Sequence, residues 1–141
     1  MIKALHNEIL IRKDELKNEK IESIYFGGGT PSLLSTIDIN SLILSVCDNY
    51  NVLDSVEVTL EANPDDLTEQ KIVELSNSRV NRLSIGVQSF FKQDLVLMNR
   101  SHTDKEAIEC IELASKYFDN ISVDLIYGIP GLDNSRWKQN I

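Results

Sequence analysis

The sequence is poor in cysteine, and this shortage excludes several kinds of site. Only two of its 141 residues are cysteines, Cys47 and Cys110. Each falls among apolar residues that recur at helical spacing, so we expect two buried, reduced thiols that act as small hydrophobic side chains. We expect neither a disulfide nor a metal site from this pair.

Basic residues and long apolar runs are also in short supply. The chain has 14 Lys and Arg against 22 Asp and Glu, a net charge of -8, and no basic block. This balance argues against nucleic acid or an anionic membrane as the main partner. The apolar runs are far shorter than the roughly 20 residues that span a bilayer. Residues 1–20 mix basic and acidic side chains, unlike a targeting segment. We therefore expect a cytoplasmic protein without membrane insertion.

Glycine is scarce as well, yet three of the six glycines are consecutive, in Tyr25-Phe26-Gly27-Gly28-Gly29-Thr30-Pro31-Ser32. Glycine permits positive φ and a close approach of ligand to backbone, and Pro31 cannot continue a strand. A tight strand-to-helix turn is the alternative, but we favour a loop that contacts a ligand. The loop lacks the Gly-Lys-Ser/Thr ending of a P-loop, and Ser32 stands where the dinucleotide fingerprint needs its third glycine.

Apolar and alternating runs predict four strands, near residues 21–26, 56–61, 82–87 and 121–127. Helical spacing between them makes the strands parallel, joined by right-handed crossovers. With all helices on one face the fold is α/β, a partial (β/α) TIM-type barrel with sequential strands. With helices on both faces the fold would be a doubly wound sheet. Sequence periodicity alone does not decide between these two folds. The length suits one domain over residues 1–141.

Helices are expected at six places, and three of them begin with a clear N-cap. Ser35, Thr68 and Thr103 are the expected caps, and Thr103 with Glu106 makes a full capping box. The expected helical segments are 2–17, the stretches after the three caps, a short turn over 90–98, and 134–141 with Trp137 facing the core. Because the chain opens inside a helix, we expect that an upstream segment is missing.

Three predicted strands carry a small or polar face, whereas buried parallel strands are usually apolar throughout. Solvated strand ends would explain each face alone. The polar residues lie near the carboxyl ends, however, where α/β folds place their sites. Together with the glycine loop they predict one site at this pole. The faces are Glu57/Thr59/Glu61, Ser84/Gly86/Gln88 and Ser122/Asp124.

Four motifs resemble the radical S-adenosylmethionine (SAM) family of oxygen-independent coproporphyrinogen III oxidases, in wording closest to its heme chaperone branch. The resemblance implies a partial barrel that holds a [4Fe-4S] cluster and SAM at its top. The motifs are the glycine stretch above, Leu60-Glu61-Ala62-Asn63-Pro64, Arg82-Leu83-Ser84-Ile85-Gly86-Val87-Gln88-Ser89-Phe90 and Asp124-Leu125-Ile126-Tyr127-Gly128-Ile129-Pro130-Gly131.

The resemblance also implies a role for each matching residue. Gly28, Gly29 and Thr30 would contact the methionine part of SAM, where peptide groups supply donors and acceptors. Glu61 would lie near its ammonium group and Arg100 would pair with its carboxylate. Gln88 and Asp124 would contact the ribose, and Ile126 and Tyr127 would line the adenosine side. The two histidines, His6 and His102, are too few and too ordinary to be assigned as heme ligands, although His102 lies beside Arg100 near a helix N-terminus.

The departure from the family concerns the cluster. The family binds it through a C-x3-C-x2-C loop after the first barrel strand, and no such motif occurs here. The resemblance therefore implies a segment of a larger protein that contributes SAM-binding strand ends and is inactive alone. The intact parent would either oxidise a porphyrinogen or carry heme as a chaperone. An inert truncated barrel is the third reading. Unpaired sheet edges would favour self-association.

Overall fold

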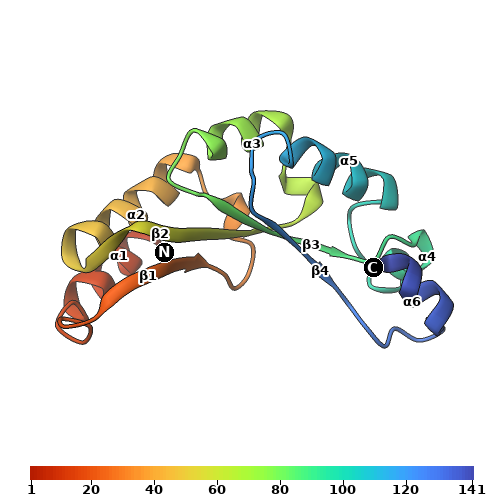
Figure 1. Cartoon of the computed structure of the whole chain (residues 1–141), viewed down its shortest axis with the longest axis horizontal. Helices are drawn as coiled ribbons and strands as arrows, with labels where there is room; N and C mark the ends of the chain where they lie inside the picture. The colour runs from red at the N-terminus through yellow and green to blue at the C-terminus, as the bar shows by residue number, and fades with distance from the viewer.

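The computed structural model describes residues 1–141 and contains one four-stranded parallel sheet in the order β1-β2-β3-β4. Each strand pairs with the one that precedes it in the sequence, as Figure 1 shows. This sequential order confirms the expected topology. The strands are β1 (Lys20–Phe26), β2 (Asn51–Ala62), β3 (Arg82–Gln88) and β4 (Ile121–Leu125).

Helices α2, α3 and α5 lie over the same face of the sheet (Figure 1). With sequential parallel strands, this arrangement confirms a partial (β/α) barrel and excludes a doubly wound sheet. None of the helices is long and apolar enough to cross a membrane. The helices are α1 (Ile2–Ile11), α2 (Thr36–Asn49), α3 (Glu69–Ser76), α4 (Lys92–Leu97), α5 (Asp104–Ala114) and α6 (Asn134–Asn140), with 3-10 turns η1 (Pro31–Leu33) and η2 (Pro64–Asp66).

The three expected N-caps are present. The side chains of Ser35 and Thr68 accept hydrogen bonds from the backbone amide of the third residue of α2 and of α3, respectively. Thr103 and Glu106 form the complete capping box of α5, with the Thr103 amide 2.7 Å from Glu106 Oε2. This backbone bond, together with the bond from the Thr103 side chain, lowers the pKa of Glu106.

The hydrophobic core lies between the sheet and its helices. The apolar face of β2 and β3 packs against α2, α3 and α5, and burial of these side chains stabilises the fold at roughly 25 cal/mol per Å² of apolar surface. Cys110 is buried in this core, which raises the pKa of its thiol to about 11. Cys47 packs against the core from α2, and both cysteines are free thiols. Fully buried members include Ile39, Ile43, Leu60, Ile72, Leu75, Leu83, Ile85 and Val87.

Several element boundaries differ from the sequence prediction. Helix α1 ends at Ile11 instead of residue 17, and Leu16 beyond it is 44% exposed with no core to pack against. Strand β2 begins five residues early because Asn51 and Val52 pair with Lys20 and Ile21 of β1, before the register between the two strands shifts. Strand β4 ends at Leu125, two residues before the predicted end at residue 127.

Trp137 also differs from its prediction. It is half-buried and packs edge-on against Tyr127, with ring centroids 5.2 Å apart, instead of facing the main core. The buried residue of α6 is Asn140, whose side-chain oxygen accepts from the Phe90 amide at 2.8 Å. The helix is thus held by a polar contact that hydrophobic periodicity does not reveal.

Candidate functional site

The carboxyl ends of the strands surround a polar pocket of about 240 Å³. Six of the eight residues proposed from the sequence line it: Gly29, Thr30, Glu61, Gln88, Arg100 and Asp124. Its other lining residues are Pro31, Ala62, Asn63, Ser84 and Gly86. Segments that are distant in the sequence therefore meet at one pole, as the positions of the polar strand ends predict.

The glycine loop forms one wall of this pocket. Gly28 and Gly29 have φ angles of 77° and 66°, a left-handed conformation that glycine adopts without steric cost. A Cβ at either position would meet no atom within 4 Å, so conformation and not crowding requires glycine here. Gly28 does not line the polar pocket, but its amide donates to Glu61 Oε2 at 3.2 Å.

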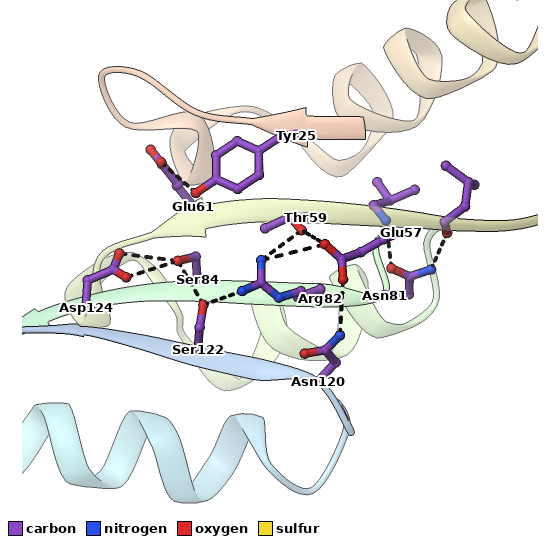
Figure 2. Close-up of polar contacts among 12 residues, drawn as sticks. Tyr25, Glu57, Thr59, Glu61, Asn81, Arg82, Ser84, Asn120, Ser122 and Asp124 are labelled. Atoms are coloured by element: carbon purple, nitrogen blue, oxygen red, sulfur yellow. Dashed lines mark hydrogen bonds and ion pairs between the residues drawn. The ribbon is translucent and has the colours of Figure 1, made fainter. Parts of the chain in front are cut away.

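Glu61 ties this loop to the end of β2. Its Oε1 accepts from the Tyr25 hydroxyl at 2.9 Å (Figure 2), while Oε2 accepts from the Gly28 amide. The bond to the Glu61 carboxylate raises the pKa of Tyr25, because it stabilises the protonated phenol. Each carboxylate oxygen keeps a second lone pair, so Glu61 can still accept from a ligand. Tyr25 belongs to the glycine motif, but nothing in the motif predicted that Tyr25 would pair with Glu61.

Gln88 has an unusual backbone conformation at the end of β3. Its φ is 71°, and the pairing of β3 with β4 shifts register between Ile85 and Gln88. A left-handed conformation costs a non-glycine residue about 1–2 kcal/mol and often marks a functional position. The Gln88 side chain lies beside Gly86, where a Cβ would come within 2.8 Å of Gln88 Nε2. Gly86 therefore leaves space for this amide.

Arg100 reaches the pocket from the loop before α5. Its Nη2 donates to Asn63 Oδ1 at 2.7 Å and to the Gly86 carbonyl at 3.2 Å. Its Nε is buried and has no hydrogen-bond partner. An unpaired buried donor is costly, and an anionic ligand would satisfy it. Asn63, which holds Arg100, follows the Leu60-Glu61-Ala62 run, and its place in that motif was the only signal of a role.

Asp124 lies at the end of β4 and its carboxylate faces the pocket. The Ser84 hydroxyl donates to its two oxygens at 3.2 and 3.4 Å (Figure 2). Asp124 is otherwise exposed, so it retains free acceptor positions. Ser84 was noted as part of a polar strand face but not as a pocket residue.

Besides Gly28, three residues noted in the sequence lie outside the pocket. Ile126 is 41% exposed, but its amide donates to the Gln88 carbonyl at 2.9 Å. This bond places Ile126 beside Gln88, which lines the pocket. Tyr127 is 71% exposed and packs on Trp137. His102 is 2% exposed and its Nε2 lies 3.0 Å from the Val87 carbonyl. His102 is thus enclosed by the protein in this structure.

A second, more apolar hollow of about 540 Å³ lies on the other side of the glycine loop. It runs between α1, β1 and α2, and it shares Gly29, Thr30 and Pro31 with the polar pocket. Its apolar walls include Leu5, Ile9 and Phe26. The glycine loop therefore separates two cavities of different polarity.

Comparison with known proteins identifies similar sequences and folds. The chain matches the model of the radical SAM superfamily over residues 5–141. It is 41% identical over 124 residues to the heme chaperone HemW of Lactococcus lactis, with 87% of this chain and 33% of the relative covered. It is 36% identical over 123 residues to the mitochondrial radical S-adenosyl methionine domain-containing protein 1 of Danio rerio, with 86% and 28% covered.

Among solved structures, the chain is similar to the coproporphyrinogen III oxidase HemN of Escherichia coli. The TM-score is 0.84 at 27% identity, with 98% of this chain and 32% of the HemN chain covered. The archaeal Elp3 of Methanocaldococcus infernus has a TM-score of 0.72 at 19% identity, a likeness of fold alone. The chain spans about a third of the length of these relatives.

Proposed function

The chain belongs to the radical SAM superfamily, and on this basis we propose that its polar pocket binds S-adenosylmethionine. The superfamily implies SAM and a [4Fe-4S] cluster in the longer proteins to which such a segment belongs. The observation that carries the proposal is the composition of the pocket. The pocket brings the carboxylates of Glu61 and Asp124 together with Arg100, whose Nε is buried and unpaired, and the glycine loop forms one of its walls.

The amino-acid end of SAM fits the glycine side of the pocket. The Glu61 carboxylate, fixed by Tyr25 and Gly28, would accept from the ammonium group. Peptide groups of the Gly28–Thr30 loop would supply donors and acceptors to the two charged groups of the methionine part. The ligand carboxylate would pair with Arg100, whose unpartnered Nε then gains an acceptor.

The nucleoside end fits the other side. Gln88 and Asp124 offer an amide and a carboxylate to the ribose hydroxyls, and both lie at the ends of adjacent strands. Ile126 would contact the adenosine from the edge of the pocket. When bound, SAM supplies a sulfonium group that serves radical chemistry. The residues of this chain bind and orient it.

The chain does not fit the cluster. Cys47 and Cys110 lie in α2 and α5 on the core side of the sheet, away from the polar pocket. No three Cys, His, Asp or Glu side chains are grouped so as to hold a metal ion. An iron–sulfur cluster needs several thiolates that converge on one point. The contribution of this chain is therefore the ligand-binding strand ends.

For the intact protein we propose a role in handling heme, in the chaperone branch. The identity of 41% to a heme chaperone, against 27% to an oxidase, favours this branch. Oxidation of a porphyrinogen is the alternative. Heme titration of the full-length protein, followed by absorbance, distinguishes the two: tight heme binding without turnover of coproporphyrinogen supports the chaperone, and turnover overturns it.

The SAM proposal is tested by calorimetry with Asp124→Asn and a matched control. Asp119→Asn removes the same charge at an exposed position near the opposite end of β4. The D124N chain should bind SAM about 5- to 150-fold more weakly, the effect of roughly 1–3 kcal/mol for a lost bond to a charged group. D119N should bind like the unmodified chain. Equal affinities for the two variants would place the SAM site elsewhere.

A further inference from the structure

A chain of hydrogen bonds runs along the inner face of the sheet, the face opposite α2, α3 and α5. Arg82 at the start of β3 donates from Nη2 to Ser122 Oγ at 3.0 Å. Ser122 donates to Ser84 Oγ at 3.0 Å, and Ser84 donates to Asp124. Figure 2 shows the series from the guanidinium to the carboxylate. We name this series, Arg82–Ser122–Ser84–Asp124, the inner-face relay.

The two ends of the relay fix the direction of every bond in it. A guanidinium only donates, so Ser122 must accept from Arg82 and its own proton is free for Ser84. An ionised carboxylate only accepts, so the Ser84 proton must point to Asp124. Hydrogen bonds aligned in one direction polarise and strengthen one another. The relay therefore delivers one well-oriented donor to Asp124.

Arg82 is firmly held at the far end. Its Nη1 donates to Thr59 Oγ1 at 3.2 Å and lies 3.8 Å from Glu57 Oε1. Thr59 in turn donates to Glu57 at 3.1 Å. The Arg82 side chain is 24% exposed, whereas Asp124 is among the exposed residues. Arg82 is thus an anchor in the sheet, and the carboxylate at the other end of the relay is the group exposed to solvent.

We propose that Arg82 and Ser122 are positioning residues for the ligand of the polar pocket. Neither lines the pocket. Acting through Ser84, they hold the Asp124 carboxylate in one orientation and leave its remaining acceptor positions open to the vicinal hydroxyls of a ribose. This inference rests on the proposed binding of SAM, since a ribonucleoside supplies those hydroxyls.

The orientation matters because Asp124 is exposed and has two rotatable side-chain bonds. A carboxylate that is free in solvent loses rotational freedom when it binds a ligand, and this loss weakens binding. A carboxylate already held by Ser84 loses less. Removing the Ser122 hydroxyl takes away the hydrogen bond that polarises the Ser84 hydroxyl. The bond from Ser84 to Asp124 should then weaken, and part of the lost rotational freedom should again count against binding.

Binding of SAM to the 141-residue chain tests the relay through Ser122. Ser122→Ala should weaken binding about two- to tenfold, as expected for one neutral hydrogen bond, while Ser122→Thr, which keeps the hydroxyl, should restore it. Ser115→Ala is the matched control, since Ser115 is exposed on the far end of α5 and bonds only the Ile111 carbonyl. Urea unfolding of each variant confirms an intact fold.

A second measurement needs no ligand. The Hα–Hβ couplings of Asp124, measured by NMR, should indicate one side-chain rotamer in the unmodified chain and in S122T, and averaging in S122A. If the unmodified chain fails to bind SAM, the proposed function is wrong while the couplings still decide the relay. Unchanged couplings in S122A overturn the positioning role. A loss of affinity in S122T equal to that in S122A overturns it too, because the hydroxyl is then irrelevant.

Discussion

Gly86→Ala is a small change that should separate the pocket from the fold. No positive φ requires glycine at this position, so alanine suits the backbone. The new methyl group would come within 2.8 Å of Gln88 Nε2, while its contacts with Asn63 Oδ1 and the Ala62 carbonyl, at 3.6 and 3.7 Å, are ordinary. The flexible Gln88 amide must therefore move, whereas Asn63 and Ala62 can keep their positions.

The magnitudes follow from these contacts. The side-chain shift costs about 1 kcal/mol or less, and the gain of 0.4–1 kcal/mol from a less flexible unfolded chain offsets it, so the free energy of unfolding should change by under about 1 kcal/mol. The displaced Gln88 amide would lose the bond to SAM that we propose, and affinity should fall about 2- to 10-fold, the equivalent of ~0.5–1.5 kcal/mol for a neutral hydrogen bond.

Three chains make the assay decisive: G86A, Gln88→Ala, and the double variant. Urea unfolding measures stability, and calorimetry measures SAM affinity. If Gly86 acts only by leaving space for Gln88, the double variant should bind no more weakly than Q88A. Additive losses would show that Gly86 acts by another route, and unchanged affinity in G86A would show that the Gln88 amide does not contact the ligand.

Three further predictions concern the chain as a whole. Anaerobic reconstitution with iron and sulfide should give no cluster absorbance and no SAM cleavage, because Cys47 and Cys110 lie apart on two helices; a stoichiometric cluster would contradict our interpretation of the cysteines. Glu106→Gln should lower stability at pH 7, where the depressed pKa of the capping Glu106 favours the folded state, and the difference from the unmodified chain should vanish as the pH falls through that pKa; Glu112→Gln, on the exposed side of α5, is the control. The outer edges of β1 and β4 have no partner strand, so the sedimentation coefficient should rise with protein concentration, and a clean monomer at high concentration would refute self-association through these edges.

Sequence periodicity predicted the sheet well because each strand has one apolar face that the helices cover. Leu83 and Ile85 alternate with polar residues, and both are fully buried. The capping residues were equally clear, since Thr103 and Glu106 satisfy backbone groups locally. Contacts that depend on tertiary structure left no such signal: Asn51 extends β2 only because β1 lies beside it, and Trp137 meets Tyr127 across a loop.

The site shows the same division. The motif residues Glu61, Gln88 and Asp124 were expected at one pole, and they lie there because parallel strands end together. The positive φ of Gln88 was not foreseen, since it follows from the register shift between β3 and β4. Likewise, no pattern in the sequence indicated that Asn63 would hold Arg100.

The inner-face relay has a consequence for the solubility of the sheet. A strand face of hydroxyls, carboxylates and one guanidinium is wettable, so it can face water without the free-energy cost that an exposed apolar face would carry. Only the side that carries Leu60 and Leu83 requires a cover, and the helices supply it. Because its inner face needs no cover, such a sheet can remain an open, partial barrel as well as form a closed one. A hydrated inner wall of this kind also means that any ligand entering there displaces water from partners that are already hydrogen-bonded to one another.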